Sequence, residues 1–288
     1  MEYRQLGRSG LQVSAIGLGT NNFGRRLDKR ATEIVINHAL DMGINMIDTA
    51  NSYSGGLSEE FIGLALKGKR QKAIIATKVS SRMSEGPNNA GNSRQHITAE
   101  VENSLKRLGT DYIDLYQIHW PDPNTPIEET LRTLDDLVRQ GKIRYFALST
   151  FSGWQLTEAV LTAEKLGVYE PVVNQVPYSL ATRRPEQEIV PACLRFGLSL
   201  TCFSPLAGGL LSGIAATKRA IGGGQRWRSG QGPGYTSEQV AVAEQLETLG
   251  AEWGHPPAHL ALAWLLSRPA VASAIIGPEN ISELEENV

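Results

Sequence analysis

The sequence predicts an α/β protein with the fold of a (β/α)8 TIM barrel, and three observations lead to that prediction. Eight apolar runs of strand length occur along the 288 residues, and helical patterns lie between them. Such alternation implies a parallel sheet, and eight repeats in a chain of this length favour a closed barrel. No stretch has the composition of a linker, so we expect residues 1–288 to form a single domain.

The strands are predicted in order from the amino terminus. Residues 3–7 and 11–14 flank the short turn at residues 8–10 and predict an N-terminal β-hairpin. The eight barrel strands follow as apolar runs at residues 14–20, 44–48, 73–78, 112–119, 143–150, 171–175, 198–204 and 272–277.

Helical periodicity is clearest in three intervening segments, at residues 97–110, 125–141 and 236–254. Gly109 ends the apolar stripe of the first segment and fits a C-terminal helix cap. Thr125 and Glu128 have the spacing of a capping box at the start of the second segment. Thr236 and Gln239 predict the same capping arrangement in the third.

An irregular segment interrupts the alternation near the carboxyl end. Residues 212–235 are rich in Gly and Arg, show no periodicity, and predict a long loop after the seventh strand. Loops of this length are usually functional or mobile, so this one is either a lid over the site or an irregular connection. The chain then stops at residues 281–288, where the last helix should begin, and we expect that helix to be truncated.

Charge and composition narrow the possible functions and the location. The formal net charge of −2 argues against a broad surface for nucleic acids or membranes. The first ten residues lack the apolar core of a signal peptide, and no apolar run reaches transmembrane length. Cys193 and Cys202 indicate neither a disulfide framework nor a metal site. We therefore expect a cytoplasmic protein.

Side chains that can take part in catalysis lie at the predicted carboxyl ends of strands, where such barrels have their active sites. The second strand ends at Asp48 with Tyr53 on the loop behind it, the third ends at Lys78, and the fourth at His119. Each group alone has an ordinary interpretation: a helix N-cap, a surface tyrosine, a paired lysine, a core histidine. Those interpretations do not explain why all four meet at one end of the barrel.

Together the four groups have a chemical logic. A tyrosine with a pKa near 10 is a weak acid at neutral pH. A neighbouring ammonium from Lys78 would lower that pKa, and Asp48 would hold the ammonium in place. A histidine beside the phenol can polarise a carbonyl or share the proton. Because the product alkoxide requires a hydride donor, we expect a nicotinamide over the mouth of the barrel and no metal.

Sequence motifs extend this prediction nearly from end to end. They are "GLGT" (17–20), "GINMIDTANSY" (43–53), "LSEEFIGLAL" (57–66), "ATK" (76–78), "DLYQIHWPD" (114–122), "VVNQVPYS" (172–179), "CFSPLAGGLLSG" (202–213) and "IIGPENISELEEN" (275–287). In these motifs the chain resembles the aldo-keto reductases, and most of all the branch with bacterial reductases and the β subunits of voltage-gated potassium channels. The resemblance implies a catalytic tetrad of Asp48, Tyr53, Lys78 and His119, with Tyr53 as general acid in reduction and general base in oxidation.

The resemblance also implies which residues bind the cofactor. Ser149 and Gln175 would hold the nicotinamide carboxamide. The ribose, pyrophosphate and adenine would be held by Thr20, Ser204, Leu206, Gly208, Glu286 and Asn287. Further cofactor-binding residues expected from their places in the same motifs are Thr150, Phe203, Gly277, Glu279 and Glu283.

Four positions depart from the family pattern. Thr150 replaces a usual Asn, Phe203 replaces a usual Tyr, and Ile214 stands where Lys often follows "LLSG". Glu279 replaces a basic residue that would bind the 2′-phosphate of NADP(H). An acid there repels a phosphate and can accept a hydrogen bond from a ribose 2′-hydroxyl, as in NAD-binding Rossmann proteins. The cofactor is therefore NADP(H) or NAD(H), and Glu279 favours NAD(H).

The leading prediction is an NAD(P)-dependent oxidoreductase acting on an aldehyde, ketone, sugar-like substrate or the corresponding alcohol. The main alternative is a regulatory subunit that binds the cofactor but turns over little. A phosphosugar isomerase barrel is a third reading, in which "SPLAGG" would bind phosphate, but it leaves the Tyr-Lys-Asp set without a role. Trp120 is either a wall of the substrate pocket or a core residue. The physiological substrate and the oligomeric state remain open.

Overall fold

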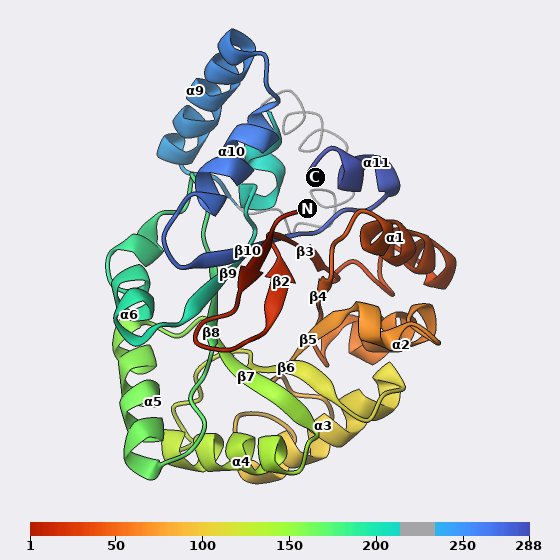
Figure 1. Ribbon diagram of the computed structural model, residues 1–288, viewed down its shortest axis with the longest axis vertical. Coiled ribbons are helices and arrows are strands. Elements are labelled where there is room, and N and C mark those ends of the chain that lie inside the picture. Colours follow the sequence, from red (N-terminus) through yellow and green to blue (C-terminus); the bar gives the residue numbers. More distant parts are fainter. Residues whose placement is uncertain (214–233) are drawn as a thin grey trace.

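The computed structural model describes residues 1–213 and 234–288, and within them eight parallel strands close into a barrel ringed by helices (Figure 1). Each strand pairs with its neighbour in sequence, and the last strand closes the barrel on the first. The barrel strands are β3 (Ile16–Gly19), β4 (Met46–Asp48), β5 (Ile74–Val79), β6 (Ile113–Ile118), β7 (Ile143–Ser149), β8 (Val173–Pro177), β9 (Ser199–Phe203) and β10 (Val271–Ile276). The predicted (β/α)8 barrel is confirmed, strand by strand.

The helices pack their apolar faces on the outside of the barrel. They are α1 (Lys29–Asp41), α2 (Leu57–Ala65), α3 (Arg94–Leu108), α4 (Ile127–Arg139), α5 (Gly153–Leu166), α6 (Ile189–Phe196), α9 (Ser237–Trp253), α10 (Pro257–Leu266) and α11 (Ile281–Glu285). No helix among residues 1–213 and 234–288 is both long and apolar enough to cross a membrane. Of the predicted loop at 212–235, residues 214–233 lie outside the described residues.

Two of the three predicted helix caps are confirmed. Gly109 caps α3 in the left-handed conformation, and Thr236 and Gln239 form the predicted capping box of α9. The capping box predicted for α4 is wrong, because the N-cap is Pro126 and no side chain caps the helix. The hydroxyl of Thr125 instead donates a hydrogen bond of 2.7 Å to the carboxylate of Asp122. A hydrogen bond to a charged carboxylate is stronger than one to a neutral backbone group, so Thr125 bonds within the preceding loop and does not cap the helix.

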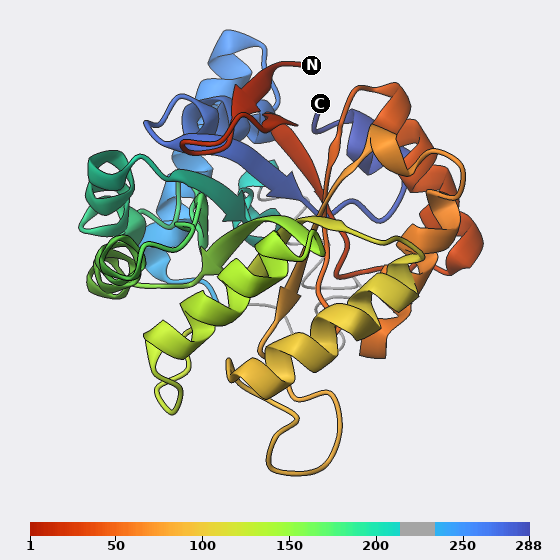
Figure 2. The ribbon, with the colours of Figure 1, turned by 60° about the horizontal axis from the view of Figure 1, so that its bottom comes forward.

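The amino end of the barrel is closed by the predicted hairpin, β1 (Tyr3–Gln5) and β2 (Gln12–Ser14), which pair antiparallel. Leu6 and Val13 of this hairpin pack against the apolar side chains that fill the barrel interior, among them Met46 and Leu115. In Figure 2 the hairpin lies on one side of the barrel and the long connection from β5 to α3 extends on the opposite side. The hairpin therefore leaves the carboxyl end of the strands free for a site.

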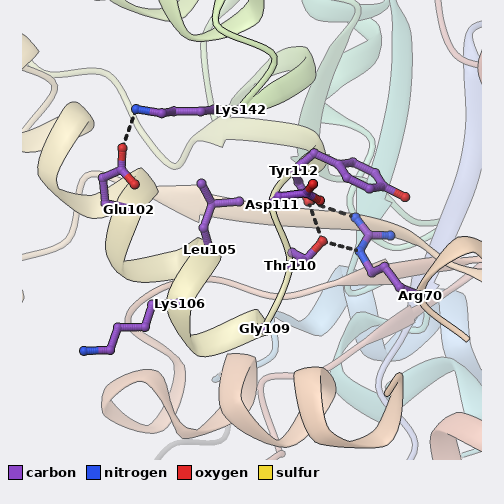
Figure 3. Close-up of a pocket in the computed structure, with 9 residues that line it drawn as sticks. All are labelled: Arg70, Glu102, Leu105, Lys106, Gly109, Thr110, Asp111, Tyr112 and Lys142. Atoms are coloured by element: carbon purple, nitrogen blue, oxygen red, sulfur yellow. Dashed lines mark hydrogen bonds and ion pairs between the residues drawn. The ribbon is translucent and has the colours of Figure 1, made fainter. Parts of the chain in front are cut away.

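An open depression on the amino side, beside the start of β6, holds several charged side chains (Figure 3). Two of its cations have partners within the protein: Arg70 donates to Asp114 at 2.6 Å and lies over the ring of Tyr112, and Lys142 pairs with Glu102. The depression contains none of the predicted catalytic groups, which lie at the other end of the barrel.

Candidate active site

A cleft of about 930 Å³ opens at the carboxyl end of the barrel, within the volume range of sites for small molecules and cofactors. All the predicted catalytic and cofactor-binding residues except Lys78 line it. They are Thr20, Asp48, Tyr53, His119, Ser149, Thr150, Gln175, Phe203, Ser204, Leu206, Gly208, Gly277, Glu279, Glu283, Glu286 and Asn287. Lys78 lies directly beneath and is 1 % exposed. The structure thus brings the predicted residues together, and Ile214 alone of those named above lies outside the described residues.

Strand periodicity explains how the barrel presents these groups. Alternate residues of a strand face the same side, so an apolar residue deep in the barrel is followed two positions later by another inward residue. Met46 and Ala76 belong to the apolar interior, and two residues further on come Asp48 and Lys78. The same spacing leads from buried Val173 to Gln175. A polar layer therefore lies on top of an apolar one, at the floor of the cleft.

The floor is organised around the buried ion pair between Lys78 and Asp48. Nζ of Lys78 donates to Oδ1 of Asp48 at 2.5 Å and to the carbonyl oxygen of Thr49 at 2.8 Å. Oδ2 of Asp48 accepts from the side-chain amides of Gln117 at 3.0 Å and Gln175 at 2.7 Å. A buried ion pair is tolerated only when its remaining polar atoms are satisfied, and here both carboxylate oxygens are.

The third neighbour of the Lys78 ammonium is the phenol of Tyr53, with 3.5 Å between Nζ and Oη. Burial alone would lower the pKa of Lys78, but the charges of Asp48 and Tyr53 and their hydrogen bonds outweigh it and hold that pKa above its usual value. Lys78 therefore stays protonated at neutral pH and points a positive charge at the phenol.

Burial is also the largest influence on Tyr53, and it raises the pKa of the phenol. Lys78 lowers that pKa, as the sequence predicted, while Asp48 raises it, and the net shift is upward. The predicted effect of Lys78 is therefore present, but the pKa of the phenol is raised overall, because desolvation of the phenolate outweighs the nearby ammonium. At neutral pH Tyr53 holds its proton, which suits a proton donor.

His119 follows β6 and faces the same space. Its ring centroid lies 6.1 Å from that of Tyr53 and 4.5 Å from that of Trp120. Burial, together with the charge of Lys78, lowers the pKa of His119 to about 3, so the imidazole is neutral at physiological pH. Nδ1 of His119 is buried and has no hydrogen-bond partner among the described residues.

Backbone strain is concentrated around the mouth of this cleft. Of the six described non-glycine residues with positive φ, five follow barrel strands, and the sixth, Ala270, precedes β10; the five are Ser54, Ser80, Thr150, Ser204 and Ala207. L-residues adopt this conformation at a cost, and such residues cluster at functional sites. After β9, Gly208 and Gly209 continue the left-handed turn, and both line the cleft.

The far end of the cleft is acidic. Glu279 forms an ion pair with Arg26, and its backbone N–H donates to the carboxylate of Glu283 at 2.8 Å. His259 bonds the carbonyl oxygen of Glu286 at 2.7 Å and also lines the cleft. Arg26 and His259 have no sequence signal that marks them as site residues. Sequence reasoning missed Gln117 too, although its place two residues before His119 was a usable signal, because alternate residues of a strand face the same side.

Comparisons with known proteins match nearly the whole chain. The model of the "Aldo/keto reductase family" matches residues 15–288. The chain is 40 % identical over 299 residues to "Uncharacterized oxidoreductase YrpG" of Bacillus subtilis, covering 100 % of this chain and 90 % of that protein. It is 35 % identical over 300 residues to "Probable voltage-gated potassium channel subunit beta" of Oryza sativa subsp. japonica, again 100 % and 90 %. "Aldo-keto reductase YhdN" of Bacillus subtilis is 36 % identical over 295 residues, covering 99 % and 87 %.

Proposed function

Because the chain belongs to the aldo/keto reductase family, we propose that this oxidoreductase transfers hydride between a nicotinamide cofactor and the carbonyl or alcohol group of a small substrate. The observation that carries the proposal is the Tyr53 phenol at the floor of the cleft, 3.5 Å from an ammonium that is itself held by buried Asp48. This arrangement provides a proton for an oxygen that gains negative charge.

The residues present fit a nicotinamide dinucleotide. Near the tetrad the cleft offers hydroxyl and amide groups from Ser149, Thr150 and Gln175, although the Gln175 amide already donates to Asp48. Gly208 and Gly209 have no side chain of their own, so a phosphate could approach the backbone of this turn closely. When bound, the cofactor would supply or accept the hydride. Ser149, Thr150 and Gln175 would orient the nicotinamide, and the turn would hold the pyrophosphate.

In reduction, Tyr53 gives its proton to the substrate oxygen as negative charge develops there. The resulting phenolate is stabilised by the ammonium of Lys78, whose place Asp48 fixes. Neutral His119 can donate one N–H toward the same oxygen without carrying a charge. In the oxidation direction the same phenolate takes the proton from the alcohol.

The acidic residues of the cleft support a preference between the two cofactors. Glu279, Glu283, Glu285 and Glu286 line its far end, so a ribose 2′-phosphate would meet several carboxylates. We therefore expect NAD(H) to bind at least as tightly as NADP(H). Replacing Glu279 with Arg should shift the preference toward NADP(H), which dissociation constants of both cofactors for both proteins would test.

The direct test of the activity is a screen of the purified protein against aldehydes, ketones and sugars with NADH and NADPH. Loss of reduced-nicotinamide absorbance that depends on both substrate and protein supports the proposal. Absence of turnover with every substrate, in a protein that binds neither cofactor, would refute it.

A second candidate function rests on the similarity to a protein named as a probable potassium channel β subunit. In that case the barrel would bind the cofactor and regulate a partner with little turnover. The two functions differ in one measurable property: tight cofactor binding without steady turnover of any simple aldehyde would favour the regulatory role.

A further inference from the structure

An ion pair joins two loops at the far end of the cleft. Arg26 lies on the connection between β3 and α1, and Glu279 lies on the connection between β10 and α11. The side chain of Arg26 is 11 % exposed, and that of Glu279 is 33 % exposed and lines the cleft. The guanidinium of Arg26 is thus paired with a carboxylate that lines the cleft.

The loop that carries Arg26 is fixed in place independently of this pair. The carbonyl oxygen of Asn22 accepts the backbone N–H groups of Arg26 at 2.9 Å and Leu27 at 3.1 Å. The side-chain amide of Asn22 donates to the carbonyl oxygen of Gly277 at 3.3 Å, across the cleft end. Removing the Glu279 charge should therefore leave Arg26 near its present place and without that counter-charge.

Arg26 and Glu279 would interact differently with the 2′-phosphate of NADP(H) and the 2′-hydroxyl of NAD(H). A guanidinium binds a phosphate strongly, in a geometry that allows two parallel hydrogen bonds. A carboxylate repels the phosphate but accepts a hydrogen bond from a ribose hydroxyl. While Glu279 engages Arg26, a 2′-phosphate must both displace that carboxylate and approach the other acids of the cleft end.

We propose that Arg26 and Glu279 together determine cofactor selectivity: Glu279 occupies Arg26 and thereby suppresses a latent site for the 2′-phosphate of NADP(H). This rests on the proposed function, because it assumes that a nicotinamide dinucleotide binds in the cleft with its adenosine ribose at this end. It places the cation on the loop after β3 rather than on the segment of Glu279 itself.

The test is calorimetric titration of the full chain with NADH and with NADPH, which reports binding without any need for turnover. Glu279→Gln should tighten NADPH binding by about tenfold or more, the scale of one charge-assisted contact. NADH binding should change much less, because an amide oxygen still accepts from the ribose hydroxyl. Adding Arg26→Met to Glu279→Gln should abolish the gain for NADPH.

Two matched variants separate this mechanism from general electrostatics. Glu285→Gln removes another carboxylate from the same cleft end, one bonded to His38 at 2.9 Å, and should give a much smaller gain. Glu279→Gln with Arg25→Met removes the neighbouring arginine of the same loop and should keep the gain. Thermal melting of each variant confirms that it is folded before titration.

The outcomes distinguish the two levels of the proposal. A gain that survives Arg26→Met, or that disappears with Arg25→Met, would overturn the role of Arg26. NADPH binding ten times tighter than NADH in the wild type would also overturn it. Binding of neither dinucleotide to any folded variant would refute the proposed function itself, and this inference with it.

Discussion

Two buried clusters of charge in this protein have similar components and different surroundings. At the floor of the cleft, Lys78 pairs with Asp48. In the helical layer outside the barrel, Arg107 of α3 donates to Glu59 of α2 at 2.6 Å and lies 3.6 Å from Glu100. Both clusters hold carboxylates removed from water, so burial of charge does not by itself mark a catalytic site.

The difference lies in what the charges face. In the outer cluster Glu59 also accepts from Thr77 at 2.5 Å, and Glu100 accepts from Asn51 and Asn103 at 2.8 and 2.9 Å. The groups bonded to these two carboxylates do not line the cleft. The Lys78 ammonium instead has a long contact to a phenol that borders open space. A catalytic cluster, on this comparison, is one with a reactive group between the charge and the cleft.

The largest expected effect comes from removing that reactive group. Tyr53→Phe deletes one hydroxyl, and loss of general acid–base catalysis should slow carbonyl reduction by about 10²–10⁴-fold. Cofactor affinity and melting temperature should stay close to wild type, because among the described residues the hydroxyl hydrogen-bonds only to Lys78, at 3.5 Å. Steady-state kinetics and cofactor titration measure the two properties, and near-normal turnover would remove Tyr53 from the role.

The outer cluster should respond in the opposite way. Arg107→Leu leaves Glu59 buried without its cation, and breaking a buried pair typically costs about 3–5 kcal/mol of unfolding free energy. Activity per folded molecule should remain near wild type. Arg94→Leu is the control, since Arg94 and its partner Asp136 are 51 % and 45 % exposed; an exposed pair contributes about 1 kcal/mol or less. Equal stability losses in the two variants would contradict the comparison.

Lys78→Met tests whether the floor charge acts on the phenol. Lys78 lowers the pKa of Tyr53 against the upward effects of burial and Asp48, so its loss should raise that pKa further. Alcohol oxidation needs the phenolate, so its residual rate should reach a plateau only at a higher pH than in wild type. The pH profile of kcat/KM for oxidation is the measurement, and an unchanged acidic limb would show that Lys78 does not tune Tyr53.

The sequence predicted the residues at the ends of the barrel strands better than the contacts between distant loops. Asp48, Lys78 and His119 end apolar runs, and strand direction alone carries them to one rim. Gln117 was within reach of the same logic, since it lies on β6 two residues before His119. Arg26 was not, because its contact with Glu279 joins positions 253 residues apart and depends on two loop conformations. The phenol pKa was also beyond sequence reasoning, since it depends on how deeply Tyr53 is buried.

The smallest expected effect concerns the strain that accompanies the cleft. In the outer layer the left-handed cap of α3 is a glycine, Gly109, whereas at the rim Thr150 has a φ of 59°. A β-branched residue is poorly suited to that conformation, and Asn adopts it more readily. Against this, the Thr150 hydroxyl donates to the carbonyl oxygens of Ser149 at 2.7 Å and His119 at 3.2 Å. The residue is exposed, so water replaces those bonds at little cost.

Thr150→Asn should therefore raise the free energy of unfolding by up to about 1 kcal/mol, the scale of left-handed strain in a single residue. Thr150→Ala is the matched control, because it removes the hydroxyl and the branch without the preference of Asn for positive φ. Denaturant unfolding of the three proteins gives the free energies. If Asn is no more stable than Ala, the rim is not strained at this residue, and the contrast with the outer layer rests on charge alone. If Asn is more stable, cofactor titration then shows whether the strain also contributes to binding.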